Sequence, residues 1–198
     1  MLLQDRLKNY RLILASASPR RRELLADCDL DFVLAEKFEC EERYPANLEA
    51  EKVAEYLSQL KSNAYPHALC KGDILLTADT VVILGNKILG KPHSEAEAHD
   101  MISTLSGATH KVVTGVTLRT TERTISFSAE SLVSFRTLEE EEISYYVEKY
   151  RPMDKAGAYG IQEWIGYIGI EGIEGSFYNV MGLPTQLLYQ ALKELICE

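Results

Sequence analysis

The first half of the chain alternates short apolar runs with stretches in which apolar residues recur at helical spacing. Arg11–Ala15 is an apolar run that predicts a buried strand, Asp31–Ala35 predicts a second strand, and Ile74–Leu84 is the strongest strand signal in the sequence. After Pro45, a stripe with helical spacing predicts a helix and consists of Leu48, Val53, Leu57, Leu60 and Ala64.

The second half favours hairpins and loops. Gly85-Asn86 predicts a turn, after which Lys87–Leu89 begins a return strand. Residues 111–120 and 123–136 predict strands, and the second alternates apolar and polar side chains cleanly. The glycine-rich stretch 154–184 predicts loops with one or two short strands.

Three further helices carry recognisable starting signals. Ser94 with Glu97, and Thr137 with Glu140, form capping-box patterns, and Pro184 opens a final amphipathic helix. Because helices alternate with strands early in the chain and the later strands look antiparallel, we expect an α/β fold with a mixed, largely extended sheet flanked by helices.

The length allows one domain or two closely packed lobes. The chain has 198 residues, and no linker-like break divides it. We therefore expect a single domain over residues 1–198.

Composition and charge restrict the functional classes. The net charge of −9 argues against a non-specific DNA binder or a binder of anionic membranes, because both need a broad basic surface. No apolar run reaches the length of a membrane span, and the N-terminus lacks a secretory apolar region. We expect reduced thiols and a cytoplasmic protein, since no CxxC pair occurs among Cys28, Cys40, Cys70 and Cys197.

A serine- and arginine-rich turn follows the first predicted strand. Ser16 and Ser18 precede Pro19, the first expected helical residue, and Arg20 and Arg21 follow at once. Free backbone N–H groups at a helix start, serine hydroxyls and arginine forks all suit phosphate, and a nearby anion would relieve the conflict between these cations and the helix dipole. The alternative is a plain helix cap with solvated arginines.

Asp79 lies in the middle of the strongest predicted strand. A carboxylate there is unfavourable unless it is paired, hydrogen-bonded or bound to a metal. Lys91, one hairpin away, is a candidate partner, and a buried ion pair is the structural alternative. An aspartate in this position can hold Mg²⁺ or deprotonate water, and a carboxylate of the acidic segment Glu36–Glu42 could complete a cation site.

Gln162 ends a segment, Asp154–Gln162, in which two glycines flank Tyr159. The glutamine amide offers a donor and an acceptor side by side, which complements the O4 and N3–H edge of uracil or thymine. An irregular glycine-rich corner with no ligand is the alternative.

Several motifs together, in the order in which they occur, resemble the Maf family of nucleoside triphosphate pyrophosphatases. The segments that carry the resemblance are Leu14–Arg21, Ala78–Val82, Leu89–Pro92, Ser106–Val116, Asp154–Gln162 and Gly175–Pro184. They span nearly the whole chain, and the form DKAGAYGIQ resembles the branch that prefers dTTP and UTP.

The resemblance implies hydrolysis of a nucleoside triphosphate to the monophosphate and pyrophosphate with a divalent metal, Mg²⁺ or Mn²⁺. It further implies two lobes around a nucleotide cleft, often in a homodimer. By position in the motifs, Asp79 would be the proton acceptor, and Glu42 would join it at the metal. The phosphate-binding positions would be Ser16, Ser18, Arg20, Arg21, Lys61 and Lys91, with Lys91 also catalytic. Base specificity would involve Arg21, Thr80 and Gln162.

Two other classes stay open. A nucleotidyl or phosphoryl transferase would use the same residues with an acceptor other than water. A nucleotide-binding regulator of cell division would bind without needing turnover, and Asp79→Asn would then leave its function intact. None of the three readings requires a nucleic acid polymer or a membrane as partner.

Overall fold

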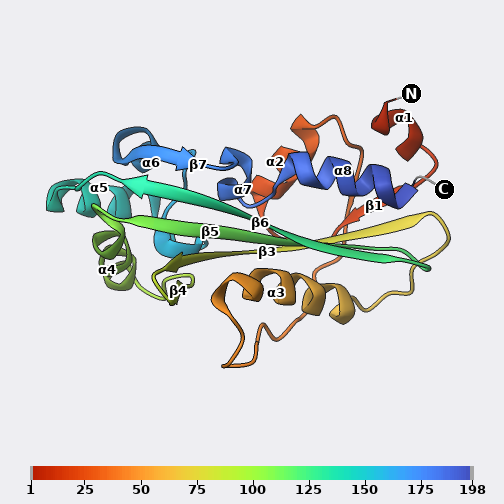
Figure 1. Cartoon of the computed structure of the whole chain (residues 1–198), viewed down its shortest axis with the longest axis horizontal. Coiled ribbons are helices and arrows are strands. Elements are labelled where there is room, and N and C mark those ends of the chain that lie inside the picture. The colour runs from red at the N-terminus through yellow and green to blue at the C-terminus, as the bar shows by residue number, and fades with distance from the viewer. Residues whose placement is uncertain (1, 197–198) are drawn as a thin grey trace. The chain divides into compact units, whose positions relative to one another are not determined.

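The computed structural model describes residues 2–196, so the predicted free thiol of Cys197 lies outside the described residues. The elements in chain order are α1 (Leu3–Leu7), β1 (Arg11–Leu14), α2 (Pro19–Asp27), β2 (Val33–Leu34), α3 (Ala50–Ala64), β3 (Asp73–Leu84), β4 (Lys87–Leu89), α4 (Glu95–Leu105), β5 (Thr109–Arg119), β6 (Thr124–Phe135), α5 (Glu140–Tyr150), the 3-10 turn η1 (Ala156–Ala158), α6 (Trp164–Gly169), β7 (Ile170–Glu174), α7 (Phe177–Met181) and α8 (Thr185–Ile196) (Figure 1).

The strands of the described part of the chain join in one mixed sheet. Their order is β2-β1-β3-β5-β6-β7, and β4 pairs with β3 off this path. β1 runs parallel to β2 and β3, with Ile13 opposite Val33 and Leu75, whereas β3–β4 and β6–β7 are antiparallel. The predicted α/β class with a mixed sheet is therefore confirmed.

The described chain divides into two compact units. The first contains the described parts of Met1–Asp79 and Gly182–Glu198, together with Thr114–Ala129, and the second contains Thr80–Val113 and Glu130–Met181. The chain passes from one unit to the other within β3, β5 and β6. That residues 1–198 form a single domain stays a prediction.

In the first unit, α3 is fixed to the strands by buried polar contacts. The hydroxyls of Ser58 and Thr117 lie 2.7 Å apart, and Thr77 Oγ1 donates to the carbonyl oxygen of Ser58 at 2.7 Å. Gly115 of β5 lies so close to α3 that an added Cβ would come within 2.3 Å of the backbone of Ala54. This packing determines which face of α3 meets β3.

The second unit has its own apolar core. Helices α4 and α5 pack together in this unit (Figure 1). Ile102, Leu105, Val133 and Tyr146 are all fully buried in one cluster that also takes in residues of the glycine-rich segment. The segment around Gln162 is therefore attached to a core rather than lying loose on the surface.

The first predicted capping box is confirmed at its Ser94 cap, although the Glu97 carboxylate accepts from the His93 N–H instead of the Ser94 N–H, and the second is displaced. Ser94 Oγ accepts from the Glu97 N–H at 3.1 Å, as the sequence predicts. The helix predicted to begin at Thr137 instead has Glu139 at its N-cap and a capping box with Glu142. The reason is Leu138, which is buried and whose N–H donates to Ser106 Oγ at 2.7 Å, so the chain stays extended for two more residues.

Helical structure occurs in two places where the sequence pattern did not indicate it. The five-residue α1 carries Leu3 and Leu7 one turn apart and packs against α8. The stretch 154–184, predicted as loops with short strands, contains β7 but also η1, α6 and α7. Helices this short depend on tertiary packing more than on local sequence. Among residues 2–196, no helix is both long and apolar enough to cross a membrane.

Candidate functional site

The serine- and arginine-rich turn connects the end of β1 to the start of α2. Ser18 occupies the N-cap position, but its side chain accepts no hydrogen bond from the helix backbone. Instead, the Ser18 N–H donates to Ser16 Oγ at 3.3 Å, and Arg21 Nη1 donates to the same oxygen at 3.1 Å. The turn therefore brings the Ser16 hydroxyl and the Arg21 guanidinium together at the first turn of a nine-residue helix, on which Arg20 also lies.

Arg21 is the best-fixed cation of this turn. Its side chain is buried, and Nε donates to the carbonyl oxygen of Gly182 at 2.8 Å, just before α8. Burial lowers the pKa of the Arg21 guanidinium, while the negative charges of Asp79 and Glu42 raise it. An arginine keeps its charge under such conditions, so a positive group stands beside two carboxylates.

Asp79, Lys61 and Glu42 form one ionic cluster in the first unit. Lys61 Nζ lies 2.5 Å from Asp79 Oδ1 and 3.1 Å from Glu42 Oε1. Asp79 and Lys61 are largely buried, with side chains 11% and 17% exposed, whereas Glu42 is 46% exposed. The sequence offered Lys91 as the partner of Asp79, but the ammonium group that the structure places on this carboxylate belongs to Lys61.

The cluster follows from regular geometry. Ser58 and Lys61 are three residues apart on α3 and share a face, while Thr77 and Asp79 are two residues apart on β3 and share a face of the strand. The Thr77–Ser58 hydrogen bond and the Lys61–Asp79 pair are consecutive contacts between these two faces. The position of the catalytic candidate therefore depends on the packing of α3.

The donor set of this cluster suits a magnesium ion bound together with phosphate. Two carboxylates already converge on one cationic nitrogen, that of Lys61. Within residues 2–196 there is no group of three or more histidine, cysteine, aspartate or glutamate side chains arranged to hold a metal by themselves. Mg²⁺ commonly uses one or two carboxylates and takes its other ligands from water and substrate phosphates, so the pair fits this ion.

Three further candidates lie in the second unit. Thr80 is half-buried on β3, Lys91 is exposed after β4, and Gln162 lies between η1 and α6. Gln162 Oε1 is buried and finds no hydrogen-bond partner among the described residues. A buried amide oxygen without a partner is unfavourable, which is consistent with a position that a ligand completes.

The structure also shows a buried polar network next to Gln162 that sequence reasoning missed. Glu163 accepts a short hydrogen bond from the Tyr146 hydroxyl, and its other oxygen lies 3.1 Å from Lys155 Nζ. Two charged residues of this network are visible in the sequence as a signal for it: Glu163 directly follows Gln162, and Lys155 lies in a segment rich in small residues.

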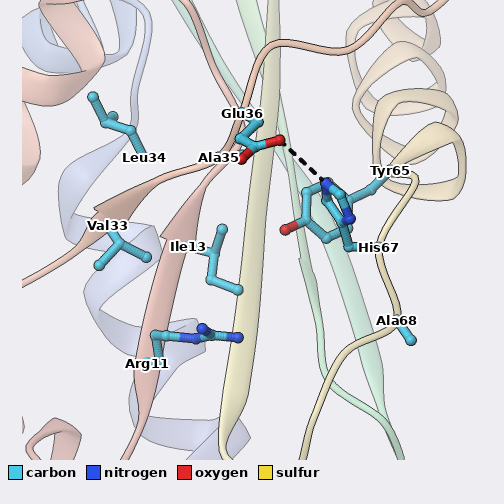
Figure 2. Close-up of a pocket in the computed structure, with 9 residues that line it drawn as sticks. All are labelled: Arg11, Ile13, Val33, Leu34, Ala35, Glu36, Tyr65, His67 and Ala68. Carbon is cyan, nitrogen blue, oxygen red and sulfur yellow. Dashed lines mark ion pairs between the residues drawn. The ribbon is translucent and has the colours of Figure 1, made fainter.

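A separate pocket lies in the first unit against β1 and β2. Figure 2 shows Arg11, Ile13, Tyr65 and His67 among its lining residues, with an ion pair of 3.8 Å between His67 and Glu36. Of the nine residues drawn, only Glu36 belongs to a sequence-predicted candidate, the acidic segment considered for a cation site. The pocket is therefore distinct from the ionic cluster of Asp79, Lys61 and Glu42.

These features define an α/β protein with a serine- and arginine-rich turn whose Arg21 lies beside a lysine-bridged pair of carboxylates. The family model for Maf-like protein matches residues 11–195, so the chain belongs to the Maf family.

Curated relatives cover nearly the whole chain. A protein of Bacteroides thetaiotaomicron named dTTP/UTP pyrophosphatase is 53% identical over 189 residues, which are 96% of this chain and 98% of that protein. A protein of the same name from Porphyromonas gingivalis (strain W83) is 54% identical over 192 residues, 96% of either chain. Among solved structures, a HAM1 protein from Coxiella burnetii matches with a TM-score of 0.48 and 14% identity, over 93% of this chain and 99% of that one.

Proposed function

We propose that the protein hydrolyses dTTP and UTP to the nucleoside monophosphate and pyrophosphate. The observation that carries the proposal is the convergence of Arg21, Lys61, Asp79 and Glu42 in one unit, since this set can hold a polyphosphate and activate water beside it. The relatives named dTTP/UTP pyrophosphatase, about half identical in sequence over nearly the whole chain, support the choice of substrate.

Substrate binding begins at the turn between β1 and α2. The hydroxyls of Ser16 and Ser18, the guanidinium groups of Arg20 and Arg21, and the backbone N–H groups at the start of α2 would bind phosphate oxygens. Lys61, and Lys91 of the second unit, are proposed as further cations for the triphosphate. Arg21 is the most preorganised of these groups, because Gly182 and Ser16 already fix its orientation.

Asp79 would act as the general base. It accepts a proton from a water molecule whose oxygen forms a bond to the α-phosphorus, and the bond from that phosphorus to the oxygen bridging to the β-phosphorus breaks. Pyrophosphate leaves with the bonding electrons, stabilised by the arginine and lysine charges. No covalent enzyme intermediate is needed.

Asp79 and Glu42 would hold the divalent metal, Mg²⁺ or Mn²⁺. When bound, such an ion polarises the phosphate and favours ionisation of water. In the structure the Lys61 ammonium contacts both carboxylates, so the two side chains lie close enough to share one cation.

Recognition of the base is proposed for Gln162, with Thr80 and Arg21. The amide of Gln162 can donate to O4 and accept from N3–H of thymine or uracil, whereas cytosine presents the opposite order of donor and acceptor. The buried, unpartnered Oε1 among the described residues supports this proposal. A cytoplasmic location and a homodimer stay predictions.

The test is a panel of nucleoside triphosphates with Mg²⁺, in which pyrophosphate and phosphate are assayed separately. We expect pyrophosphate release to be greatest with dTTP or UTP and to fall by at least about 100-fold in Asp79→Asn. Asp31→Asn, which changes an exposed aspartate of the same unit, is the matched control. Release of phosphate in place of pyrophosphate, or full activity in Asp79→Asn, would overturn the proposal.

A further inference from the structure

The segment that carries Gln162 is held from both sides by one tyrosine hydroxyl. Tyr146 of α5 is fully buried, and its hydroxyl donates to Glu163 and accepts from the Gly160 N–H at 3.0 Å. The Glu163 N–H in turn donates to the carbonyl oxygen of Gly160 at 3.0 Å. Gly160, Glu163 and Tyr146 therefore close a ring of hydrogen bonds around the two residues between them, one of which is Gln162.

A buried lysine completes this network. Lys155 Nζ lies 3.1 Å from Glu163 Oε1 and 2.7 Å from Asp154 Oδ1, and the Lys155 side chain is 9% exposed. Burial and the neighbouring Glu163 raise the pKa of the Tyr146 hydroxyl, so it stays a proton donor. The carboxylate of Glu163 thus has a donor on each oxygen, which fixes its side chain.

The side chains of the network pack closely against Gly160. A Cβ at this position would lie 2.9 Å from Glu163 Cδ and 3.1 Å from Lys155 Cε. Downstream, the Glu163 carbonyl oxygen accepts from the Gly166 N–H at 2.9 Å, which ties the ring to the start of α6. Gln162 therefore projects from a backbone that is fixed on both flanks.

We propose that Tyr146 and Glu163 are positioning residues that set the orientation of the Gln162 amide and thereby the discrimination between thymine or uracil and cytosine. The inference rests on the proposed function, since it assigns the network to the base-reading step of that reaction. A donor–acceptor pair distinguishes the two base edges only when its orientation is held, because a rotated amide would accept the cytosine edge equally well.

The variant Tyr146→Phe removes the hydroxyl and keeps the ring. The matched control is Tyr145→Phe, its neighbour on α5, whose exposed hydroxyl receives a hydrogen bond from Lys149 and whose ring contacts Trp164. With Mg²⁺, we expect kcat/KM for dTTP to fall about tenfold in Tyr146→Phe and the preference for dTTP over dCTP to shrink by a similar factor. Tyr145→Phe should retain both values.

A double variant separates positioning from general destabilisation. In a Gln162→Ala background, Tyr146→Phe should cause no further loss of the dTTP over dCTP preference, because the residue through which it acts is gone. The emission of Trp164, the single tryptophan of the chain, reports on the same segment and should shift in Tyr146→Phe.

The outcomes distinguish this inference from the function on which it rests. If the wild-type protein releases no pyrophosphate from any triphosphate, the proposed function fails. If the wild type is active and Tyr146→Phe keeps its preference, or loses activity equally for dTTP and dCTP, the positioning role is contradicted. An undiminished effect of Tyr146→Phe on the preference in the Gln162→Ala background would contradict it as well.

Discussion

Lys61 Nζ lies 2.5 Å from Asp79 Oδ1, so the proposed general base forms an ion pair with a lysine of the neighbouring helix α3. The same ammonium lies 3.1 Å from Glu42. Both side chains of the 2.5 Å pair are largely buried, and removing one partner of such a pair leaves a charge poorly compensated. Lys61 is therefore expected to be indispensable to the geometry of the carboxylates.

Replacing Lys61 by methionine should lower kcat/KM for dTTP by about 100-fold, because both a phosphate-binding cation and the bridge between the carboxylates are lost. Steady-state assay of pyrophosphate release measures the change. Lys52→Met, on the same helix and exposed, is the control and should behave as wild type. Equal activity of the two variants would contradict this role for Lys61.

Removing divalent metal with a chelator should abolish pyrophosphate release, and added Mg²⁺ should restore it. In Glu42→Gln, the Mg²⁺ concentration for half-maximal activity should rise about tenfold, since one carboxylate ligand is lost. Glu41→Gln alters an adjacent exposed carboxylate that pairs with Arg43 and should leave the metal requirement unchanged. A metal requirement that is the same in both variants would show that Glu42 is not a ligand.

The buried His110 predicts acid sensitivity of folding. Its Nε2 lies 2.8 Å from the Tyr159 hydroxyl, and burial lowers the pKa of the imidazole to about 4. Because the unfolded chain binds this proton more readily, the stability contributed by the neutral imidazole is complete above about pH 6.5 and is lost as the pH falls towards about 4.

The loss over that window should be on the order of 3 kcal/mol. Urea unfolding at several pH values tests it, with His110→Gln as the comparison. The free energy of unfolding of the variant should depend less on pH between about 6.5 and 4. Equal slopes in the two proteins would rule out His110 as the source.

Gly115 should be irreplaceable for packing reasons. An added Cβ would lie 2.2 Å from the backbone nitrogen of Glu55, so Gly115→Ala must displace α3. We expect a loss of about 2–4 kcal/mol in the free energy of unfolding, together with reduced activity, since α3 carries Lys61. Gly172→Ala, where a Cβ meets nothing within 4 Å, is the control in denaturant unfolding. Similar stabilities of the two variants would contradict the close packing.

The sequence predicted the regular elements well where pattern and cap agreed. Lys87–Leu89 is found as predicted, and Ser94 caps its helix. The displaced start of α5 shows the limit, because a buried Leu138 and a hydrogen bond to the distant Ser106 override a local capping pattern. No single-sequence pattern encodes such a contact.

For the candidate site, too, the sequence predicts some features and misses others. The serine- and arginine-rich turn and Asp79 can both be recognised as candidates from the sequence. Asp79 stands out because an aspartate within an apolar strand is unfavourable without a partner. The identity of that partner is not, because Lys61 reaches Asp79 only through the packing of α3 on β3. The sequence gives no signal for a role of Tyr146, and only its contacts with Glu163 and Gly160 reveal the network.

The most direct test of the proposed reaction is hydrolysis of dTTP in ¹⁸O-labelled water, followed by mass spectrometry of both products. Attack of water at the α-phosphorus predicts one labelled oxygen in dTMP and unlabelled pyrophosphate. Label in pyrophosphate, or in free phosphate, would place the attack at another phosphorus and contradict the role assigned to Asp79.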